Sequence, residues 1–361
     1  MNRHHLFPLV AAAACVALSG AVIPGDAQAG ATVFTSQKCV TCHSVQGKGG
    51  SSAPDLGKRT ARGYTPVEMA ALMWNHAPSM WSAMEKAGVE KPKLSVEQSA
   101  DLFAYFFAAR YFDTPGDAGR GRKLFVGKGC SDCHNITGAN AEGGRPVMSW
   151  QSVADPIELA RQMWNHAGPM HEAMSKKKLT PPQLTAVEMN DIIVYLQNLP
   201  QTKSLKPEFA PASAETGETL FKVKGCAECH KDVTAFAKKA PLRTMADFAS
   251  VMWNHSAKMN QKQSDLRPEE MKRLVGYLWA VQFSETGGDM GRGKKVFTDK
   301  GCSGCHNQGF PLKAPVSPYN VVAALWAHGP DMQKQMATKK VAWPRFEGTQ
   351  MADLLTFANG K

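Results

Sequence analysis

The chain has 361 residues, of which 43% are hydrophobic and 20% are charged, and its formal net charge is +11. This length predicts more than one domain, usually two or three. After Ile23 no segment is apolar enough to cross a bilayer, which excludes an integral membrane protein with several spans.

The N-terminus has the pattern of a secretory signal peptide. A short basic start precedes an apolar run over residues 6–23, and Ala27-Gln28-Ala29 is a small-x-small cleavage site. The apolar run is short for a stable membrane anchor. We therefore expect export to the periplasm, removal of the signal peptide 1–29, and a mature chain that begins near Gly30 and has no transmembrane span.

Eight of the nine cysteines fall into four pairs with identical spacing, and each pair is followed at once by a histidine. The motifs are Cys39, Cys42 and His43; Cys130, Cys133 and His134; Cys226, Cys229 and His230; and Cys302, Cys305 and His306. An even cysteine count in an exported chain normally indicates disulfides, but here every pair also brings a histidine. Thiols at this spacing can add to the two vinyl groups of a haem, and the next residue then faces the iron as its proximal ligand. A zinc site would need a second pair of ligands near each motif, and no cysteines remain to supply them. We predict four covalent haem c groups.

The surroundings of the motif also repeat. Each motif follows a short helical segment with a phenylalanine four or five residues ahead of the first cysteine: Phe34, Phe125, Phe221 and Phe297. A loop proline comes next, followed by a middle helix and an amphipathic closing helix. The loop prolines are Pro54, Pro146, Pro241 and Pro315, and the closing helices are expected at 96–107, 187–199, 268–279 and 348–357.

With these features in this order, each repeat resembles a class I c-type cytochrome domain, and the resemblance covers nearly all of the mature chain. It implies an all-α fold of four tandem small cytochrome c-like helical domains, each around one covalent haem c. We place the domains at 30–113, 115–200, 211–285 and 286–361. Residues 201–214, rich in proline, serine and lysine, are the expected flexible linker between two halves with two haems each. The resemblance further implies that a carbonyl of the proline loop accepts a hydrogen bond from the proximal imidazole.

A Trp-x-His-x-x-x-Met pattern occurs once in every repeat and holds the candidates for the sixth iron ligand. The methionines are Met80, Met170, Met259 and Met332, and the alternatives are His76, His166, His255 and His328. The resemblance favours methionine, because in that family a thioether from the loop after the middle helix binds the iron. Proline or glycine between the two candidates predicts that the helix breaks or bends there and that the methionine lies on the turn. Histidine recurs equally well, and at i and i+4 both side chains share one helix face. We rank methionine first, and expect the tryptophan either to cover the haem edge or to pack in the core.

Four closed haem sites predict an electron carrier rather than an enzyme. The expected function is the transfer of single electrons between respiratory redox partners, with the redox change carried by the cofactor. One alternative is a haem enzyme, peroxidase-like or reducing nitrogen oxides, with one open site, and another is an electron-transfer subunit of a larger redox complex. The expected partners are redox proteins, including a membrane-bound donor or acceptor, steered by surface lysines, with no role for nucleic acid.

Overall fold

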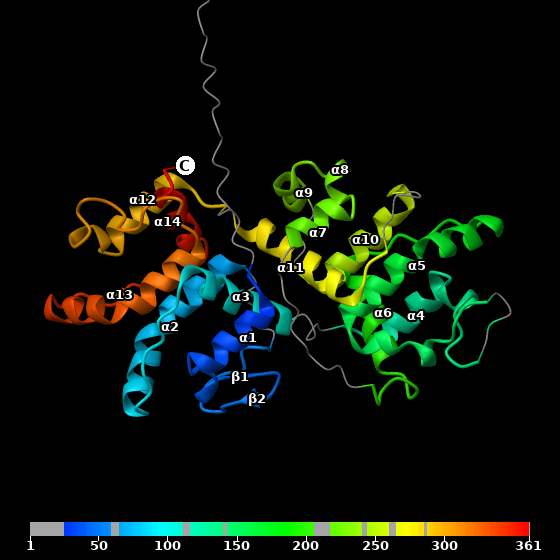
Figure 1. Ribbon diagram of the computed structural model, residues 1–361, viewed down its shortest axis with the longest axis horizontal. Helices are drawn as coiled ribbons and strands as arrows, with labels where there is room; N and C mark the ends of the chain where they lie inside the picture. Colours follow the sequence, from blue (N-terminus) through cyan, green and yellow to red (C-terminus); the bar gives the residue numbers. More distant parts are fainter. Residues whose placement is uncertain are drawn as a thin grey trace, which may run out of the picture.

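The computed structural model describes residues 25–58, 65–110, 116–138, 140, 143–205, 217–239, 244–259, 265–284 and 287–360. These residues are mostly helical, which confirms the expected all-α fold. The helices repeat in four successive groups, which we call modules 1 to 4 and which span 25–110, 116–205, 217–284 and 287–360. Figure 1 shows the modules gathered into two lobes.

Each module contains a first helix, a short Cys-x-x-Cys turn, a middle helix and a closing helix. Module 1 has α1 (Ala27–Ser36), a 3₁₀ turn (Cys39–Thr41), the small hairpin β1 (Ser44–Val45) and β2 (Lys48–Gly49), α2 (Pro66–Lys86) and α3 (Val96–Arg110). Module 2 has α4 (Ala118–Gly127), 3₁₀ turns (Cys130–Asp132, Val147–Ser149 and Gln151–Ala154), α5 (Pro156–Lys176) and α6 (Ala186–Gln197). Module 3 has α7 (Gly217–Val223), α8 (Cys226–Cys229), α9 (Val233–Lys239), α10 (Met245–Met259) and α11 (Pro268–Ser284). Module 4 has α12 (Met290–Asp299), a 3₁₀ turn (Cys302–Gly304), α13 (Pro318–Thr338) and α14 (Gln350–Ala358). The four closing helices thus lie where the periodicity predicts them.

The first and closing helices cross in the same way in all four modules. A glycine of the first helix lies so close to the closing helix that a Cβ on Gly121 or Gly293 would stand 2.0 Å from a backbone oxygen there. One turn later the predicted phenylalanine is buried and contacts an aromatic ring of the closing helix, with ring centres 5.5 to 5.9 Å apart. The ring pairs are Phe34–Tyr105, Phe125–Tyr195, Phe221–Tyr277 and Phe297–Phe357. This shared crossing brings modules 3 and 4 into the same architecture as modules 1 and 2.

Module 1 begins earlier than the sequence predicts. Asp26 caps α1 by accepting a hydrogen bond from the Ala29 N–H, and its own N–H donates to Asp101 Oδ1 at 2.7 Å. Asp117 and Asp289 make the same pair of bonds in modules 2 and 4. Removing such a cap costs about 1 kcal/mol. The first helix therefore starts before the predicted boundary at Gly30 and includes Ala27 to Ala29. Residues 1–24 lie outside the described residues.

The modules pair out of chain order. Helices α5 and α6 of module 2 pack on α10 of module 3, and α2 and α3 of module 1 pack on α13 of module 4. Figure 1 shows modules 1 and 4 on the left and modules 2 and 3 on the right. These pairs, called the 1·4 pair and the 2·3 pair, differ from the halves predicted from the linker. Of that linker only 201–205 is described, and there Thr202 is buried against module 2, to which its hydroxyl donates a hydrogen bond.

The hydrophobic core is shared between modules. One cluster of buried side chains runs through modules 1, 2 and 3 and includes Tyr319 and Trp326 of α13, while a second lies mainly in module 4. Each small module therefore draws part of its buried apolar surface from its neighbours. Within the described part of the chain, no helix has the length and apolar character needed to cross a membrane.

Candidate haem sites

Each Cys-x-x-Cys-His motif forms one tight turn. The residue before the first cysteine has a left-handed backbone, with φ of 77° at Gly129, 79° at Gly225 and 78° at Gly301. Glycine suits this conformation, and module 1 uses Lys38 with φ of 62° instead. The N–H of the motif histidine then donates to the carbonyl of the first cysteine at 2.9 to 3.0 Å in every module. Both thiols and the imidazole are thus presented from a single turn.

The eight thiols are free in this structure, and none is joined in a disulfide. Burial raises the pKa of Cys39 and of Cys130 to about 11, and raises that of Cys226 and Cys302 in the same direction. A zinc site needs deprotonated thiolates, which this apolar setting disfavours. Among the described side chains, no three His, Cys, Asp or Glu residues converge as a metal-ion cluster. The donor set fits thioether attachment better than zinc.

The proline loop positions the proximal imidazole in two modules. His43 Nδ1 lies 2.8 Å from the Pro54 carbonyl oxygen, and His134 Nδ1 lies 3.2 Å from that of Arg145, the residue before Pro146. A carbonyl partner on Nδ1 leaves Nε2 for the iron and fixes the ring orientation. Pro241 lies outside the described residues, and no described residue accepts a hydrogen bond from the His306 ring in module 4.

The distal candidates of modules 2, 3 and 4 face their proximal rings. The ring centres are 6.5 Å apart for His134 and His166, 5.8 Å for His230 and His255, and 6.4 Å for His306 and His328. A metal bound between two imidazoles, with bonds of about 2 Å on each side, holds the ring centres roughly 6 Å apart. The residues present therefore fit a haem iron with two histidine ligands.

The electrostatics of these pairs favour the neutral, ligating form of imidazole. Burial lowers the pKa of His134, of His230 and of His306, and in each case the facing histidine lowers it further. Metal binding needs the unprotonated ring. The proximal rings His134, His230 and His306 are thus favoured in the form that can ligate a metal.

Module 1 differs in detail. The rings of His43 and His76 make no contact with each other among the described residues, and His76 is exposed. His76 Nδ1 lies 2.7 Å from the Leu72 carbonyl oxygen, one helical turn back. Histidines that bind metals usually donate their other ring N–H in this way. His76 shares this kind of Nδ1 contact, and its role as a ligand stays a prediction.

The methionines lie on helices rather than on turns. Pro78, Pro169 and Pro330 stand inside the continuous helices α2, α5 and α13, so the helix does not break there and the expectation of a methionine on a turn is wrong. A proline removes one backbone hydrogen bond, and here the helix continues through it. Met80 and Met170 pack against the shared core. Met332 is half-buried, and Met259 ends α10 with its side chain outside the described residues. Methionine ligation itself stays a prediction.

Three of the four tryptophans of the repeated pattern, Trp74, Trp253 and Trp326, contact a neighbouring module. Trp74 Nε1 donates to the Pro344 carbonyl of module 4 at 2.9 Å, and Trp253 Nε1 donates to the Pro182 carbonyl of module 2 at 2.7 Å. Trp326 of module 4 directs its Nε1 toward the Met73 sulfur at 3.2 Å. Core packing, one of the two expectations, is the role these contacts support.

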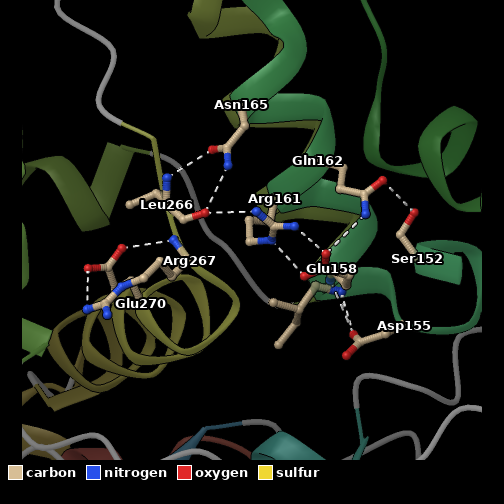
Figure 2. A network of polar contacts seen from close by, with 10 residues as sticks. Ser152, Asp155, Glu158, Arg161, Gln162, Asn165, Leu266, Arg267 and Glu270 are labelled. Carbon is tan, nitrogen blue, oxygen red and sulfur yellow. Dashed lines mark hydrogen bonds and ion pairs between the residues drawn. The ribbon is translucent and has the colours of Figure 1, made fainter. Parts of the chain in front are cut away.

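The sequence reasoning missed the asparagine between the tryptophan and the histidine. Asn165 Nδ2 donates to the Leu266 carbonyl at 2.9 Å and its Oδ1 accepts from the Leu266 N–H at 3.0 Å, as Figure 2 shows. Asn254 makes the same two bonds with Leu184, and Asn75 makes them with Phe346. We call this two-bond contact the asparagine clasp. Its signal in the sequence is an asparagine at the same place in three of the four patterns, with Ala327 in the fourth.

Comparison with known proteins identifies part of this architecture. The Cytochrome c family model matches residues 27–106 and 118–200, which fall in modules 1 and 2. No curated protein and no solved structure matches the chain. The two tandem matches support a c-type cytochrome with repeated modules, and such domains carry haem-based electron transfer.

Proposed function

We propose that the protein is an exported four-haem cytochrome that carries single electrons between redox proteins in the periplasm. The observation that carries the proposal is the motif turn and helix crossing of modules 1 and 2, repeated in modules 3 and 4 outside the family matches. When bound, a haem supplies a one-electron redox change at each turn. The protein supplies attachment, ligands and a buried setting.

The residue roles follow from the geometry. The cysteines Cys39, Cys42, Cys130, Cys133, Cys226, Cys229, Cys302 and Cys305 tether the haems, and His43, His134, His230 and His306 are proximal ligands. For the distal position we propose histidine in place of methionine: His76, His166, His255 and His328. Support comes from the ring separations in modules 2 to 4, the Nδ1 contact of His76 and the helical position of the methionines.

Two histidine ligands per iron favour a carrier over an enzyme. Catalysis at haem needs an open or easily vacated coordination position, whereas each module offers a ligand on both sides. Histidine on both sides also gives a lower reduction potential than a histidine and a methionine. We therefore place these haems below the potential range that methionine ligation would set.

Intact mass measurement of the purified holoprotein tests the proposal. We expect the mass of four covalent haems, and three in the double variant Cys226→Ala/Cys229→Ala of module 3. A holoprotein with two haems would restrict the function to the matched modules and overturn the four-haem proposal. Carbon monoxide binding to the reduced protein separates the alternatives: no binding supports the carrier, and binding at one haem supports an enzyme with an open site.

A further inference from the structure

The spatial order of the modules differs from their order in the chain. In the 2·3 pair, Asn165 clasps Leu266 of module 3 and Asn254 clasps Leu184 of module 2. Arg161 also donates to the Leu266 carbonyl at 2.9 Å. Figure 2 shows the Asn165 and Arg161 bonds to Leu266. Together with the Asn254 clasp, these bonds put modules 2 and 3 in direct contact.

The 1·4 pair is closed by aromatic rings. Trp343 of module 4 stacks on Trp74 with ring centres 5.0 Å apart and packs edge-on against Trp81 at 5.4 Å. Phe103 of α3 contacts Tyr319 of α13 at 5.7 Å. Module 4 therefore lies directly against module 1, although the chain separates them by two modules.

Helix α11 of module 3 packs on α2 and α3 of module 1 and joins the two pairs, and an aromatic stack lies at this contact. Phe107 in α3 of module 1 and Trp279 in α11 of module 3 lie face to face, with ring centres 4.1 Å apart and an angle of 18° between the planes. Trp279 is only 1% exposed and is among the largest fully buried side chains. The crossing between the pairs thus runs through tightly packed rings where modules 1 and 3 meet, near the centre of the molecule in Figure 1.

We propose that electrons move through the protein in the spatial order module 4, module 1, module 3, module 2, or its reverse, rather than in chain order. The inference rests on the proposed function, in which each module holds one haem. Electron tunnelling weakens steeply with distance through protein, so modules whose helices pack on each other should exchange electrons before modules that share less contact. Each step oxidises the iron of one module and reduces that of the next, with no bond or proton change. Modules 2 and 4 are then the ends, where one-electron redox proteins donate and accept.

Two equivalent surface positions can carry a label that tests the order in which electrons move between modules. Leu179 of module 2 and Val341 of module 4 each follow a lysine with φ of 57° at the end of the middle helix, and are 46% and 43% exposed. In Leu179→Cys or Val341→Cys, a photoexcitable ruthenium complex bound to the new thiol injects one electron at a known module. Because the two sites are structurally matched, a difference in onward rate reports the route rather than the attachment.

A distal-ligand variant provides the detector. His76→Met gives module 1 a different iron ligand from the others, which raises its potential and makes it the electron's end point. Its oxidation state is then followed by the thioether-to-iron charge-transfer band, or by a high-spin signal if the methionine does not bind. His255→Met provides the same detector in module 3.

The expected results reverse between the two detectors. With His76→Met, module 1 is reduced faster from the label at 341 than from the label at 179; with His255→Met, the label at 179 is faster. Faster reduction of module 1 from the label at 179, which chain order requires, would overturn the proposal, as would equal rates from both labels. Failure of the proposed function shows itself differently, as fewer than four haems or no electron uptake from either label.

The central stack gives a second test. Trp279→Leu should slow transfer from the label at 179 to module 1 several-fold, while Trp279→Phe, which keeps a ring against Phe107, should retain most of the rate. Transfer from the label at 341 to module 1 should be unchanged in both, because it does not cross this stack. Equal rates in the leucine and phenylalanine variants would remove the stack from the route.

Discussion

The 2·3 pair and the 1·4 pair use the same repeated motif but are held together by different forces. In the 2·3 pair two asparagine clasps face each other across the interface. In the 1·4 pair only Asn75 forms a clasp, because residue 327 is alanine, and the aromatic rings around Trp81 and Trp343 fill the remaining contact. The histidine of the motif stays in all four modules while its neighbour changes. The histidine is thus the same in all four modules, whereas the contacts that hold a pair of modules together differ between the two pairs.

The two interfaces differ in the interaction that stabilises them, hydrogen bonds in one and buried apolar area in the other. In the 2·3 pair each clasp gives hydrogen bonds to the backbone N–H and C=O of a buried leucine, and at Leu266 the carbonyl also accepts from Arg161. The aromatic cluster instead stabilises through buried apolar area and ring contacts. Removing a ring should thus weaken the 1·4 pair through lost area and a cavity, and removing an asparagine should weaken the 2·3 pair through unsatisfied polar groups.

The largest effect is expected from Trp81→Ala. Trp81 is 3% exposed, contacts Trp326 and Trp343, and lies against Gly329, where an added Cβ would stand 2.5 Å from its ring. Loss of the ring should lower the free energy of unfolding by about 3 to 5 kcal/mol, measured by denaturant titration of the holoprotein. Trp81→Phe, the control, should cost clearly less. A loss below about 1 kcal/mol for the alanine variant would show that the cluster does not hold the 1·4 pair.

Asn165→Ala should have the next largest effect. It leaves the Leu266 N–H without its partner, while the Leu266 carbonyl keeps Arg161. We expect a loss of about 1 to 3 kcal/mol in the same titration. Asn254→Ala, which makes module 3 resemble module 4 at this position, should cost a similar amount at Leu184. Near-zero losses for both would mean that water replaces the clasps and that they do not order the pair.

Ala327→Asn should sharpen the comparison by adding the missing clasp. Its expected partner is Leu94, which occupies the position of Leu184 and Leu266 and is 8% exposed. Two added hydrogen bonds should stabilise the protein by about 1 kcal/mol, seen as a higher denaturant midpoint. A destabilised variant would show that the aromatic cluster leaves no room for the amide.

The smallest effect concerns a carboxylate under the first helix. In module 4 Arg292 donates two hydrogen bonds to Asp353. Burial alone would raise the pKa of Asp353, but the Arg292 bonds and other hydrogen bonds hold this pKa below its usual range. In module 1 residue 29 is alanine instead of arginine, and burial raises the pKa of Asp101. A carboxyl group whose pKa is lowered by folding stabilises the protein at pH values above its unfolded pKa, and this stabilisation is lost as the pH falls. A carboxyl group whose pKa is raised by folding destabilises the protein at those higher pH values.

Ala29→Arg should therefore lower the pKa of Asp101 and increase stability at neutral pH by up to about 1 kcal/mol, since the matching Arg292 is largely exposed. Arg292→Gln should do the reverse in module 4 and flatten the acid limb of the stability profile. Unfolding titrations between about pH 3 and 7 measure the stability of both variants, because this interval includes the usual carboxylate pKa of about 4. Parallel profiles for the variants and the parent would contradict this pairing.

Local chemistry was predictable from the sequence because it depends on short spacings. The Cys-x-x-Cys-His turns, the buried phenylalanines and the closing helices all follow from contacts within a few residues or from helical periodicity. The candidate ligand pair at i and i+4 was also found. What the sequence could not decide was which member faces the proximal ring, because helix continuity through Pro78 and Pro169 depends on packing around the helix.

The module pairs could not be predicted by the same means. Asn75 contacts Phe346 across 271 residues, and nothing in the local pattern specifies such a partner. The boundary predicted at Gly30 lies inside α1, because a small-x-small pattern and a capped helix start coincide at Asp26 to Ala29. Alignment of the repeats with one another carried a usable signal, since Asp26, Asp117 and Asp289 occupy one position and Asn75, Asn165 and Asn254 another.

The most direct measurement is a combined near-infrared and EPR spectrum of the oxidised holoprotein, because the proposed histidine ligands on both sides of each iron are what favours a closed carrier over an enzyme. We expect wholly low-spin iron and no thioether-to-iron charge-transfer band. A band scaled to four haems would assign Met80, Met170, Met259 and Met332 as ligands and contradict the histidine proposal, and a persistent high-spin fraction would contradict the closed carrier.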